Sequence, residues 1–282
     1  MQIAIVDNLS GLQQQLTDVA KAGKRVALVP TMGALHAGHI SLIEEAKKRA
    51  DFVVATIFVN PKQFGANEDF SKYPRMLEAD IKKLEEAGAA LLYAPDEADM
   101  YPEGYSTTVS PGDLGTVLCG KFRPGHFDGV ATVVSKLLLR VLPHVALFGE
   151  KDYQQLCIIR RVVYDLDMPI EIVGVPTMRE ADGLALSSRN AYLTADERAR
   201  APALYRALAQ GARSIEGGAP VNQAIGETLA LLMASGFKPD YVELRSEGWL
   251  EPLENYDRPA RLLAAAWLGK TRLIDNIALG VS

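Results

Sequence analysis

Two histidines, His36 and His39, stand three residues apart in a glycine-flanked turn. The apolar run at 25–29 before this turn predicts a buried strand that Pro30 ends, and apolar residues at helical spacing after the turn predict a helix. In an open parallel sheet, a strand-to-helix turn lies at the carboxyl ends of the strands, where ligands bind, and the free N–H groups of the helix start suit phosphate. We therefore expect both imidazoles to approach one phosphate-bearing ligand.

Three other interpretations of this turn compete. Gly33 and Gly38 imitate the spacing of a Walker A loop, but His39 and Ile40 stand where that loop needs Lys and Ser or Thr. A zinc site would need a third ligand, and neither of the two cysteines has a paired spacing that supplies one. Histidines also fill turns without any chemical role, but two of the chain's four histidines in one such turn make this a minority interpretation.

Other polar residues follow predicted strands. Gln63 comes after the apolar strand at 52–59, and its neutral amide suits a hydroxylated substrate about as well as a plain surface position. Lys151 follows another buried strand and opens a helix, where its charge favours an anionic ligand, although a solvated charge cluster is also normal there. Gln155, one turn further on, is expected to face the same cleft.

A second cationic segment lies later in the chain. Ser187 and Ser188 stand beside Arg189, and two hydroxyls next to a guanidinium can hold phosphate oxygens, although the pattern is common in loops. Arg123 and His126 add one more cation and one titratable ring in an irregular region. These groups together point to phosphoryl or nucleotidyl transfer, in which positioning and charge neutralisation supply most of the rate.

Composition narrows the class of protein. The 282 residues are 48% hydrophobic and carry a net charge of -5, enough for one large α/β domain or a main domain with a smaller companion. Without a basic tract, no nucleic-acid partner is expected. Two cysteines favour a reducing compartment, so the cytoplasm is the expected location, and no apolar segment is long enough to span a bilayer.

Strands and helices alternate along the first 176 residues, which predicts βαβ units and a parallel sheet. Besides the elements around the histidine turn, we expect strands at 52–59, 91–93, 145–148 and 170–175, and helices at 76–87, 130–142 and 153–166. Residues 96–127 have no sustained period and predict a functional loop.

The polar stretch after Pro176 indicates a boundary, so the predicted domains are residues 1–176 and 177–282. In the second domain, Thr194 and Glu197 form the pattern of a capping box, for a helix running towards Gln210. Beyond it we expect a helix at 221–234 and strands at 241–244, 261–267 and 272–277.

Five motifs in this order closely resemble those of the pantothenate synthetases, also called pantoate:beta-alanine ligases: residues 29–39, 58–64, 123–127, 148–155 and 184–190. The segments 265–269 and 273–276 extend the resemblance over nearly the whole chain. Residues 36–39 fit the His-x-Gly-His signature of a nucleotidyltransferase superfamily to which this family belongs.

The resemblance implies an α/β fold: a Rossmann-type, doubly wound parallel sheet that binds ATP and pantoate, and a smaller α/β carboxyl-terminal lid domain. It also implies a cytoplasmic homodimer that acts on small molecules, with Mg2+ as cofactor. ATP and pantoate would give pantoyl adenylate and pyrophosphate, and beta-alanine would then displace AMP to form pantothenate.

Carried over residue by residue, the resemblance gives catalytic roles to His39, the expected proton donor, and to His36, Lys151 and Arg189. The ATP-binding residues it implies are Met32, Gly33, Ala34, Leu35, His36, Ala37, Gly38, His39, Gly149, Glu150, Lys151, Asp152, Met178, Leu186, Ser187, Ser188 and Arg189. Gln63 and Gln155 would bind pantoate, and Gln63 would also bind beta-alanine. Met178 stands where the family often has a small aliphatic residue near adenine. The metal ligands are not fixed, although Glu78 and Asp80 lie in a region where the family tends to be acidic.

Two other functions fit the same residues. One is a nucleotidyltransferase of this fold that stops after transferring a nucleotide to a phosphorylated acceptor and releasing pyrophosphate. The other is an ATP-binding module without catalysis. Amine-dependent release of AMP separates the ligase from both.

Overall fold

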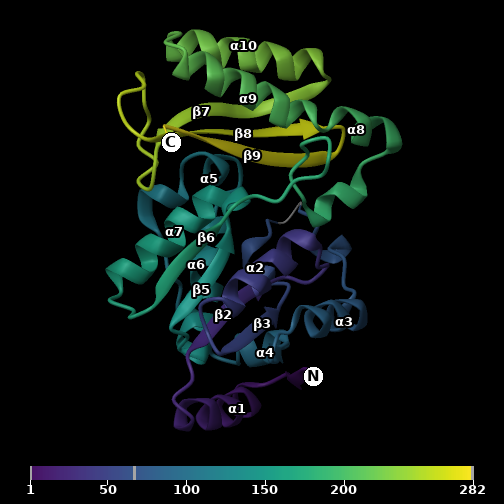
Figure 1. The fold of residues 1–282 in the computed structure, drawn as a ribbon, viewed down its shortest axis with the longest axis vertical. Helices are drawn as coiled ribbons and strands as arrows, with labels where there is room; N and C mark the ends of the chain where they lie inside the picture. Colours follow the sequence, from purple (N-terminus) through teal and green to yellow (C-terminus); the bar gives the residue numbers. More distant parts are fainter. Residues whose placement is uncertain (1, 66–67, 281–282) are drawn as a thin grey trace. The chain divides into compact units, whose positions relative to one another are not determined.

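The computed structural model describes residues 2–65 and 68–280, which form two compact units (Figure 1). The first unit comprises Met1–Glu150 and Ile158–Pro176. The second unit comprises Lys151–Cys157 and Thr177–Ser282, so it takes in the beginning of a helix as well as the end of the chain.

Within the described residues, the first unit holds a six-stranded sheet in the order β1-β4-β3-β2-β5-β6, and every pair of neighbours is parallel. The predicted parallel α/β sheet is confirmed. Its strands are β1 (Ala4–Val6), β2 (Val26–Thr31), β3 (Phe52–Ile57), β4 (Leu91–Tyr93), β5 (Val145–Gly149) and β6 (Glu171–Val175). The helices that go with it are α1 (Leu9–Lys21), α2 (Ala37–Lys47), α3 (Leu77–Ala87), α4 (Glu97–Met100), α5 (Cys119–Phe122), α6 (His126–Val141) and α7 (Tyr153–Asp165).

Both faces of this sheet are buried, which is why its central strands are continuous apolar runs. Ala27 and Val29 of β2 point towards α2, where Leu42 and Ile43 join them in one core cluster. Leu28, which points to the opposite face, is also fully buried, and α6 packs against β2 there. Alternate residues of one strand therefore belong to two separate layers of the core.

The strand order places a switch point between β2 and β5. From β2 the chain continues to β3 and β4 on one side, whereas from β5 it continues to β6 on the other side. β2 and β5 are neighbours through Ala27 and Leu28, so the turns after these two strands leave the sheet at the same edge. Ligands of open α/β sheets bind at such a point.

Pro30 does not end the strand, so that prediction is wrong. β2 continues to Thr31 and pairs with β3 along its full length, but it pairs with β5 only at Ala27 and Leu28. Among the described strands, one side of β2 beyond Leu28 has no partner, and a residue without an N–H is tolerated at such an edge.

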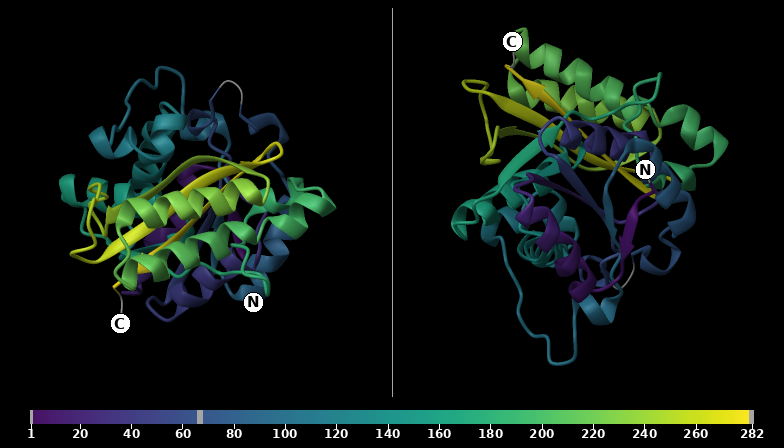
Figure 2. Two further views of the ribbon diagram at one scale, coloured as in Figure 1. Left: turned by 90° about the horizontal axis from the view of Figure 1, so that it is seen from above. Right: turned by 60° about the horizontal axis from the view of Figure 1, so that its bottom comes forward.

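The second unit is an antiparallel sheet of three strands in the order β7-β8-β9, with helices packed on one face. The prediction of a second, smaller unit of helices and strands is confirmed. Its elements are α8 (Ala195–Arg200), α9 (Ala203–Glu216), α10 (Val221–Ala234), β7 (Phe237–Ser246), β8 (Ala260–Leu268) and β9 (Thr271–Leu279). Figure 2 shows α9 and α10 side by side across the strands.

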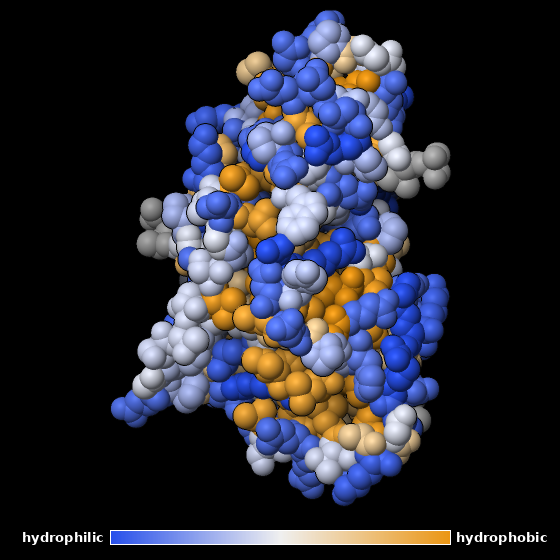
Figure 3. Space-filling model, turned by 90° about the vertical axis from the view of Figure 1, so that its left-hand side faces the viewer, coloured by the Kyte–Doolittle hydropathy of each residue, from blue (hydrophilic) through white to orange (hydrophobic). Residues whose placement is uncertain are grey.

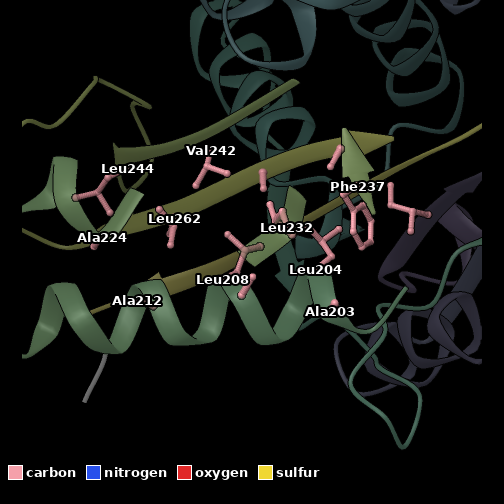
Figure 4. Packing of buried hydrophobic residues seen from close by; sticks show 14 of the residues in the cluster. Ala203, Leu204, Leu208, Ala212, Ala224, Leu232, Phe237, Val242, Leu244 and Leu262 are labelled. Atoms are coloured by element: carbon pink, nitrogen blue, oxygen red, sulfur yellow. The ribbon is translucent and has the colours of Figure 1, made fainter. Parts of the chain in front are cut away.

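Leucines supply the core of this second unit. Leu204 and Leu208 of α9 pack with Leu232 of α10 and Leu262 of β8 in one buried cluster (Figure 4). Each of these four side chains is at most 2% exposed. One face of the sheet is thus covered by helices and well packed.

The predicted capping box is confirmed, but the predicted single helix is wrong. Thr194 accepts a hydrogen bond from the N–H of Glu197, whose carboxylate accepts one from the N–H of Thr194. The helix that follows, α8, ends at Arg200, and α9 begins at Ala203. Pro202 separates them, because proline offers no N–H to continue a helical ladder.

Within the described part of the chain, no helix combines the length and the apolar character that crossing a bilayer requires.

Gly129 in α6 provides a test of how tightly the helix packs on the turn before Gln63. A Cβ at this position would lie 2.2 Å from the carbonyl oxygen of Lys62, which is backbone and cannot swing away. We expect Gly129→Ala to lower the free energy of unfolding by about 1–3 kcal/mol in urea titrations.

Gly226→Ala in α10 is the matched control, because a Cβ there meets nothing within 4 Å. It should raise the free energy of unfolding by up to about 1 kcal/mol through better helix propensity. Equal shifts in both variants would contradict the close contact at Gly129.

Candidate active site

The two histidines also cap a helix. His36 is the N-cap of α2, and its Nδ1 accepts a hydrogen bond from the N–H of Gly38 at 3.2 Å. His39 Nδ1 accepts from the N–H of His36 at 3.3 Å, and the two ring centroids are 4.1 Å apart. Because each Nδ1 is an acceptor, the neutral rings carry their hydrogen on Nε2. Two imidazole donors therefore stand at a helix N-terminus.

A buried carboxylate holds the turn in front of these rings. Asp80 of α3 is 1% exposed, and its two oxygens accept from the N–H groups of Ala34 and Leu35 at 2.7 and 2.8 Å. Gly33 and Ala34 have φ of 81° and 52°, a left-handed conformation that such bonds help to hold. Lys83, one turn along α3, donates to the carbonyl oxygen of Leu35 at 2.6 Å.

The hydrogen bonds of Asp80 also decide whether the acidic region of Glu78 and Asp80 can hold a metal ion. Both oxygens of Asp80 are engaged by the backbone of the turn, whereas Glu78 in the same helix is exposed. Among the described residues, no group of three or more His, Cys, Asp and Glu side chains is arranged to hold a metal ion. Asp80 is therefore an anchor of the histidine turn.

Gln63 lies beside this turn with its amide held in one orientation. It is 8% exposed, its Oε1 accepts from Asn60 Nδ2 at 3.1 Å, and its Nε2 contacts Met32 Sδ at 3.2 Å. Asn60 in turn accepts a hydrogen bond from the hydroxyl of Tyr101 at 2.7 Å. The structure thus brings Gln63 together with the first residue of the predicted ATP-binding segment.

Burial raises the pKa of Tyr101 well above its ordinary value. Its hydroxyl therefore stays protonated at neutral pH and can donate only one hydrogen bond, the one that it gives to Asn60. Because Tyr101 donates to the side-chain oxygen of Asn60, the side-chain NH2 of Asn60 faces the amide oxygen of Gln63. The amide nitrogen of Gln63 is therefore directed away from Asn60.

Arg123 and His126 are engaged with the same region. Arg123 donates two hydrogen bonds of 2.6 Å to Glu68, and its third nitrogen lies 2.9 Å from His126 Nε2. Burial raises the pKa of Glu68, but the hydrogen bonds and charge of Arg123 outweigh it and hold this pKa below its ordinary value. His126 Nδ1 lies 2.8 Å from the carbonyl oxygen of Gln63. These residues brace the turn that carries Gln63.

The end of β5 supplies Gly149 and Glu150, both half-buried. Since β5 neighbours β2, this strand end leaves the sheet at the same edge as the histidine turn. Within the first unit, the structure therefore gathers at one edge the predicted residues of the histidine turn, Gln63 and the start of the 149–152 segment.

The other predicted residues belong to the second unit. Lys151 has a side chain that is 20% exposed, and its Nζ lies 3.5 Å from Asp152 Oδ2. Gln155 is half-buried one turn further along α7.

A short hairpin in the second unit joins two of the predicted ATP-binding residues. Arg179 and Ala185 form an antiparallel bridge, and Leu186 N donates to the carbonyl oxygen of Met178 at 3.0 Å. Met178 is 40% exposed. The residues predicted to contact adenine and phosphate are thus direct neighbours across the hairpin.

The hairpin leads into the Ser-Ser-Arg segment. Ser187 caps a short 3₁₀ helix, η5 (Ser188–Tyr192), by accepting from the N–H of Arg189 at 3.3 Å. Ser187, Ser188 and Arg189 are all half-buried. This cap holds the start of the Ser-Ser-Arg segment in a defined turn.

Asp80, Lys83, Asn60 and Tyr101 shape the site but were not predicted to do so. Asn60 could have been found, because it stands in the same motif as Gln63. Asp80 bonds to a residue 46 positions away, and a single sequence gives no signal for such a pair.

A parallel α/β sheet with imidazole donors at its switch point places the chain among the α/β enzymes that bind nucleotides. Residues 4–278 match the family model described as pantoate-beta-alanine ligase. The chain therefore belongs to the pantoate-beta-alanine ligase family and is a ligase that forms a carbon–nitrogen bond.

Named relatives agree with this family. The pantothenate synthetase of Paramagnetospirillum magneticum is 56% identical over 278 residues, covering 98% of each chain. The structure of pantothenate synthetase from Thermus thermophilus has a TM-score of 0.92 at 46% identity and covers 98% of this chain and 99% of that one. The pantoate-beta-alanine ligase of Francisella tularensis, complexed with beta-gamma ATP and beta-alanine, has a TM-score of 0.83 at 36% identity, with 99% of each chain covered.

Replacing the anchor of the histidine turn should loosen it. Asp80→Asn turns one acceptor into a donor that faces a backbone N–H, so we expect the free energy of unfolding to fall by about 1–3 kcal/mol. Urea unfolding measures this change. Glu78→Gln, an exposed neighbour in α3, is the control and should leave stability within about 0.5 kcal/mol; an equal effect of both substitutions would contradict the anchor.

Proposed function

We propose that this chain condenses pantoate with beta-alanine in two steps that use ATP. A carboxylate oxygen of pantoate attacks the α-phosphorus, the bond to pyrophosphate breaks, and pantoyl adenylate forms. The amine of beta-alanine then attacks the acyl carbon, AMP leaves, and the amine gives up a proton. Membership of the family supports this proposal, and so does the Francisella tularensis relative complexed with beta-gamma ATP and beta-alanine.

The pair of imidazoles at the start of α2 carries the proposal from this chain's own geometry. Both rings hold their hydrogen on Nε2, at a helix N-terminus that already favours negative charge. We assign proton donation to His39 and phosphate contact to His36. Negative charge builds on the α-phosphate during in-line attack, and donors fixed in advance stabilise it at little reorganisation cost.

The remaining phosphate contacts are assigned to the second unit. Lys151 and Arg189 supply full positive charges, and Ser187 and Ser188 add hydroxyl donors. Gly149, Glu150 and Asp152 are assigned to the nucleotide, Met178 to its base end, and Leu186 to the triphosphate. These assignments rest on the motifs of the family and on the hairpin that makes Met178 and Leu186 neighbours.

Pantoate is assigned to Gln63 and Gln155, and beta-alanine also to Gln63. Because Gln63 Oε1 accepts from Asn60, its Nε2 is the group turned towards Met32 and the ligand side. An amide donor in a buried position suits the hydroxyl or carboxylate oxygens of pantoate. Neutral amides bind such a substrate without neutralising the carboxylate that must attack.

Mg2+ fits this site as an ion carried by the nucleotide. Magnesium in nucleotide sites is held by phosphate oxygens with one or two carboxylates and several waters, so it needs no cage of protein ligands. Asp80 is committed to the histidine turn, and among the assigned residues Glu150 and Asp152 carry the carboxylates that could contact such an ion. When bound, Mg2+ would neutralise charge on the triphosphate.

We also propose a homodimer located in the cytoplasm. Leu139 and Leu142 at the end of α6 are 58% and 68% exposed, and Leu166 just after α7 is 53% exposed. Figure 3 shows apolar side chains gathered among charged ones on one face of the molecule. Apolar surface of this kind supports a partner subunit, and light scattering on the purified chain tests the proposal.

A product assay tests the whole reaction. The purified chain is given Mg2+, ATP, pantoate and beta-alanine, and AMP and pantothenate are followed together. Equal amounts of both, dependent on the amine, are expected. Pyrophosphate with a stable nucleotide product would favour a nucleotidyltransferase, and ATP binding without turnover would favour a binding module.

His39→Ala and Lys151→Ala should each slow adenylate formation at least about a hundredfold, as expected for losing one electrostatic contact in a site shielded from water. Rapid-quench measurement of pyrophosphate release gives this rate. The fold should remain intact by circular dichroism, with Lys24→Ala, an exposed lysine, as the control. Near-wild-type rates in both variants would remove the assignment.

Gln63→Ala should mainly raise the KM for pantoate, because it deletes a donor assigned to that substrate. Steady-state kinetics with each substrate varied in turn separates the effects. Gln14→Ala, an exposed glutamine in α1, serves as the control. A change confined to the KM for ATP would show that Gln63 is misassigned.

A further inference from the structure

The segment 273–276, which the resemblance singled out, carries two buried polar residues that the proposed chemistry does not use. Asp275 is 3% exposed and Asn276 is 4% exposed, and both lie in β9 of the second unit. Neighbouring residues of a strand point to opposite faces of the sheet. Each face therefore receives one of these side chains.

Asp275 lies on the face covered by α9 and holds the hairpin before the Ser-Ser-Arg segment. Its two oxygens accept from Arg179 Nη1 and Nη2 at 2.6 and 2.8 Å, a bidentate pair. Arg179 also donates to the carbonyl oxygen of Gly183 at 3.1 Å and stacks on the ring of Tyr205, with 4.0 Å to its centroid. The hairpin is thereby fixed to the sheet through one side chain of β9.

Asn276 lies on the other face and holds the Lys151 segment. Its Nδ2 donates to the carbonyl oxygen of Lys151 at 3.0 Å, and its Oδ1 accepts from Arg261 Nη1 at 2.7 Å. Arg261 stacks on the ring of Tyr153, two residues after Lys151, with 3.9 Å to its centroid. The hydroxyl of Tyr153 accepts from the N–H of Gly248 at 3.1 Å. Backbone and ring contacts thus fix the segment that carries Lys151.

We propose that Asp275 and Asn276 are positioning residues for adenylate formation. Both lie on one strand, where Asp275 holds the segment that leads to Arg189 and Asn276 holds the segment that carries Lys151. This inference rests on the proposed roles of Lys151 and Arg189 at the phosphates. Arg189 is three residues beyond Leu186, the last residue that pairs across the hairpin, and Lys151 is held at its own carbonyl group. A shift of about 1 Å in either cation is enough to slow the reaction on the order of a hundredfold.

The two half-reactions distinguish positioning from general stability. The triphosphate is present only while the adenylate forms, so the positioning residues should act in that step and leave the attack of beta-alanine almost unaffected. The first rate is measured as pyrophosphate released in a rapid quench with ATP, Mg2+ and pantoate. The second rate is measured after long loading with these substrates, by adding beta-alanine and following pantothenate.

Asn276→Asp tests the contact with Lys151. The substitution keeps an oxygen facing Arg261 and removes the N–H that faces the Lys151 carbonyl oxygen. We expect adenylate formation to slow about 10- to 100-fold, with the attack of beta-alanine changed less than about threefold. Equal loss in both half-reactions, or wild-type rates in both, would overturn the proposal.

Asp275→Asn tests the contact with Arg179, and the chain offers a matched control in the same sheet. Asp240 accepts from Arg272 Nε at 2.8 Å, and the side chains of this pair are 11% and 13% exposed. Asp240 also accepts from Trp267 Nε1 at 3.2 Å, so Asp240→Asn removes a partly buried ion pair of the same sheet without touching the hairpin or the Lys151 segment. We expect Asp275→Asn to slow adenylate formation at least about tenfold relative to Asp240→Asn.

The control for the proposed function is the wild-type chain itself. If it makes no AMP or pantothenate, the proposed function fails before any variant is compared. If it is active and Asp275→Asn behaves like Asp240→Asn in both half-reactions, the proposed function stands and the positioning of the hairpin is refuted.

Discussion

The histidine turn depends on side chains that accept hydrogen bonds from backbone N–H groups which neither the sheet nor the helix satisfies. A strand that turns into a helix exposes several such donors, and leaving them buried without partners is costly. In this chain Asp80 accepts two of them, and the imidazoles of His36 and His39 accept two more. These hydrogen bonds hold the turn in one conformation, and the neutral rings carry their hydrogen on Nε2.

A common feature of the assigned residues is that other groups hold them in place. Gln63 receives a hydrogen bond from Asn60, which in turn receives one from Tyr101. Lys151 is held at its carbonyl oxygen by Asn276, and the hairpin before Arg189 is held by Asp275. Catalysis of phosphoryl transfer depends largely on such prior positioning, because a cation that must first be ordered stabilises the transition state less.

Periodicity and turn chemistry were enough to predict most elements. The buried strands β3 and β4 and the helix α10 appear close to where the apolar pattern placed them. The two failures at proline have opposite causes. Pro30 is tolerated inside β2 because one side of that strand has no partner there, which only the strand order reveals, whereas Pro202 interrupts a pattern that is typical of one continuous helix.

The residues of the candidate site were predicted from their motifs and remain a prediction, whereas their supporting partners were not predicted. His36 and His39 share a motif, so their proximity follows from spacing alone. Asp80 is 46 residues from Ala34, and Asn276 is 125 residues from Lys151. Such pairs depend on how α3 and β9 pack, and the residue types alone, one aspartate or asparagine among many, do not distinguish them.

His36 and His39 contribute to the fold and to the candidate site through different nitrogens of the same ring. The Nδ1 that accepts a backbone N–H at the start of α2 fixes the tautomer, so each neutral ring carries its hydrogen on Nε2. A replacement that offers only a cation, such as lysine, would lose the acceptor that caps the start of the helix. One that offers only an acceptor, such as aspartate, would lose the donor. A substitution at either position would thus weaken both the helix cap and the candidate site. A lineage that no longer needed the activity would still be under selection to keep both histidines for stability.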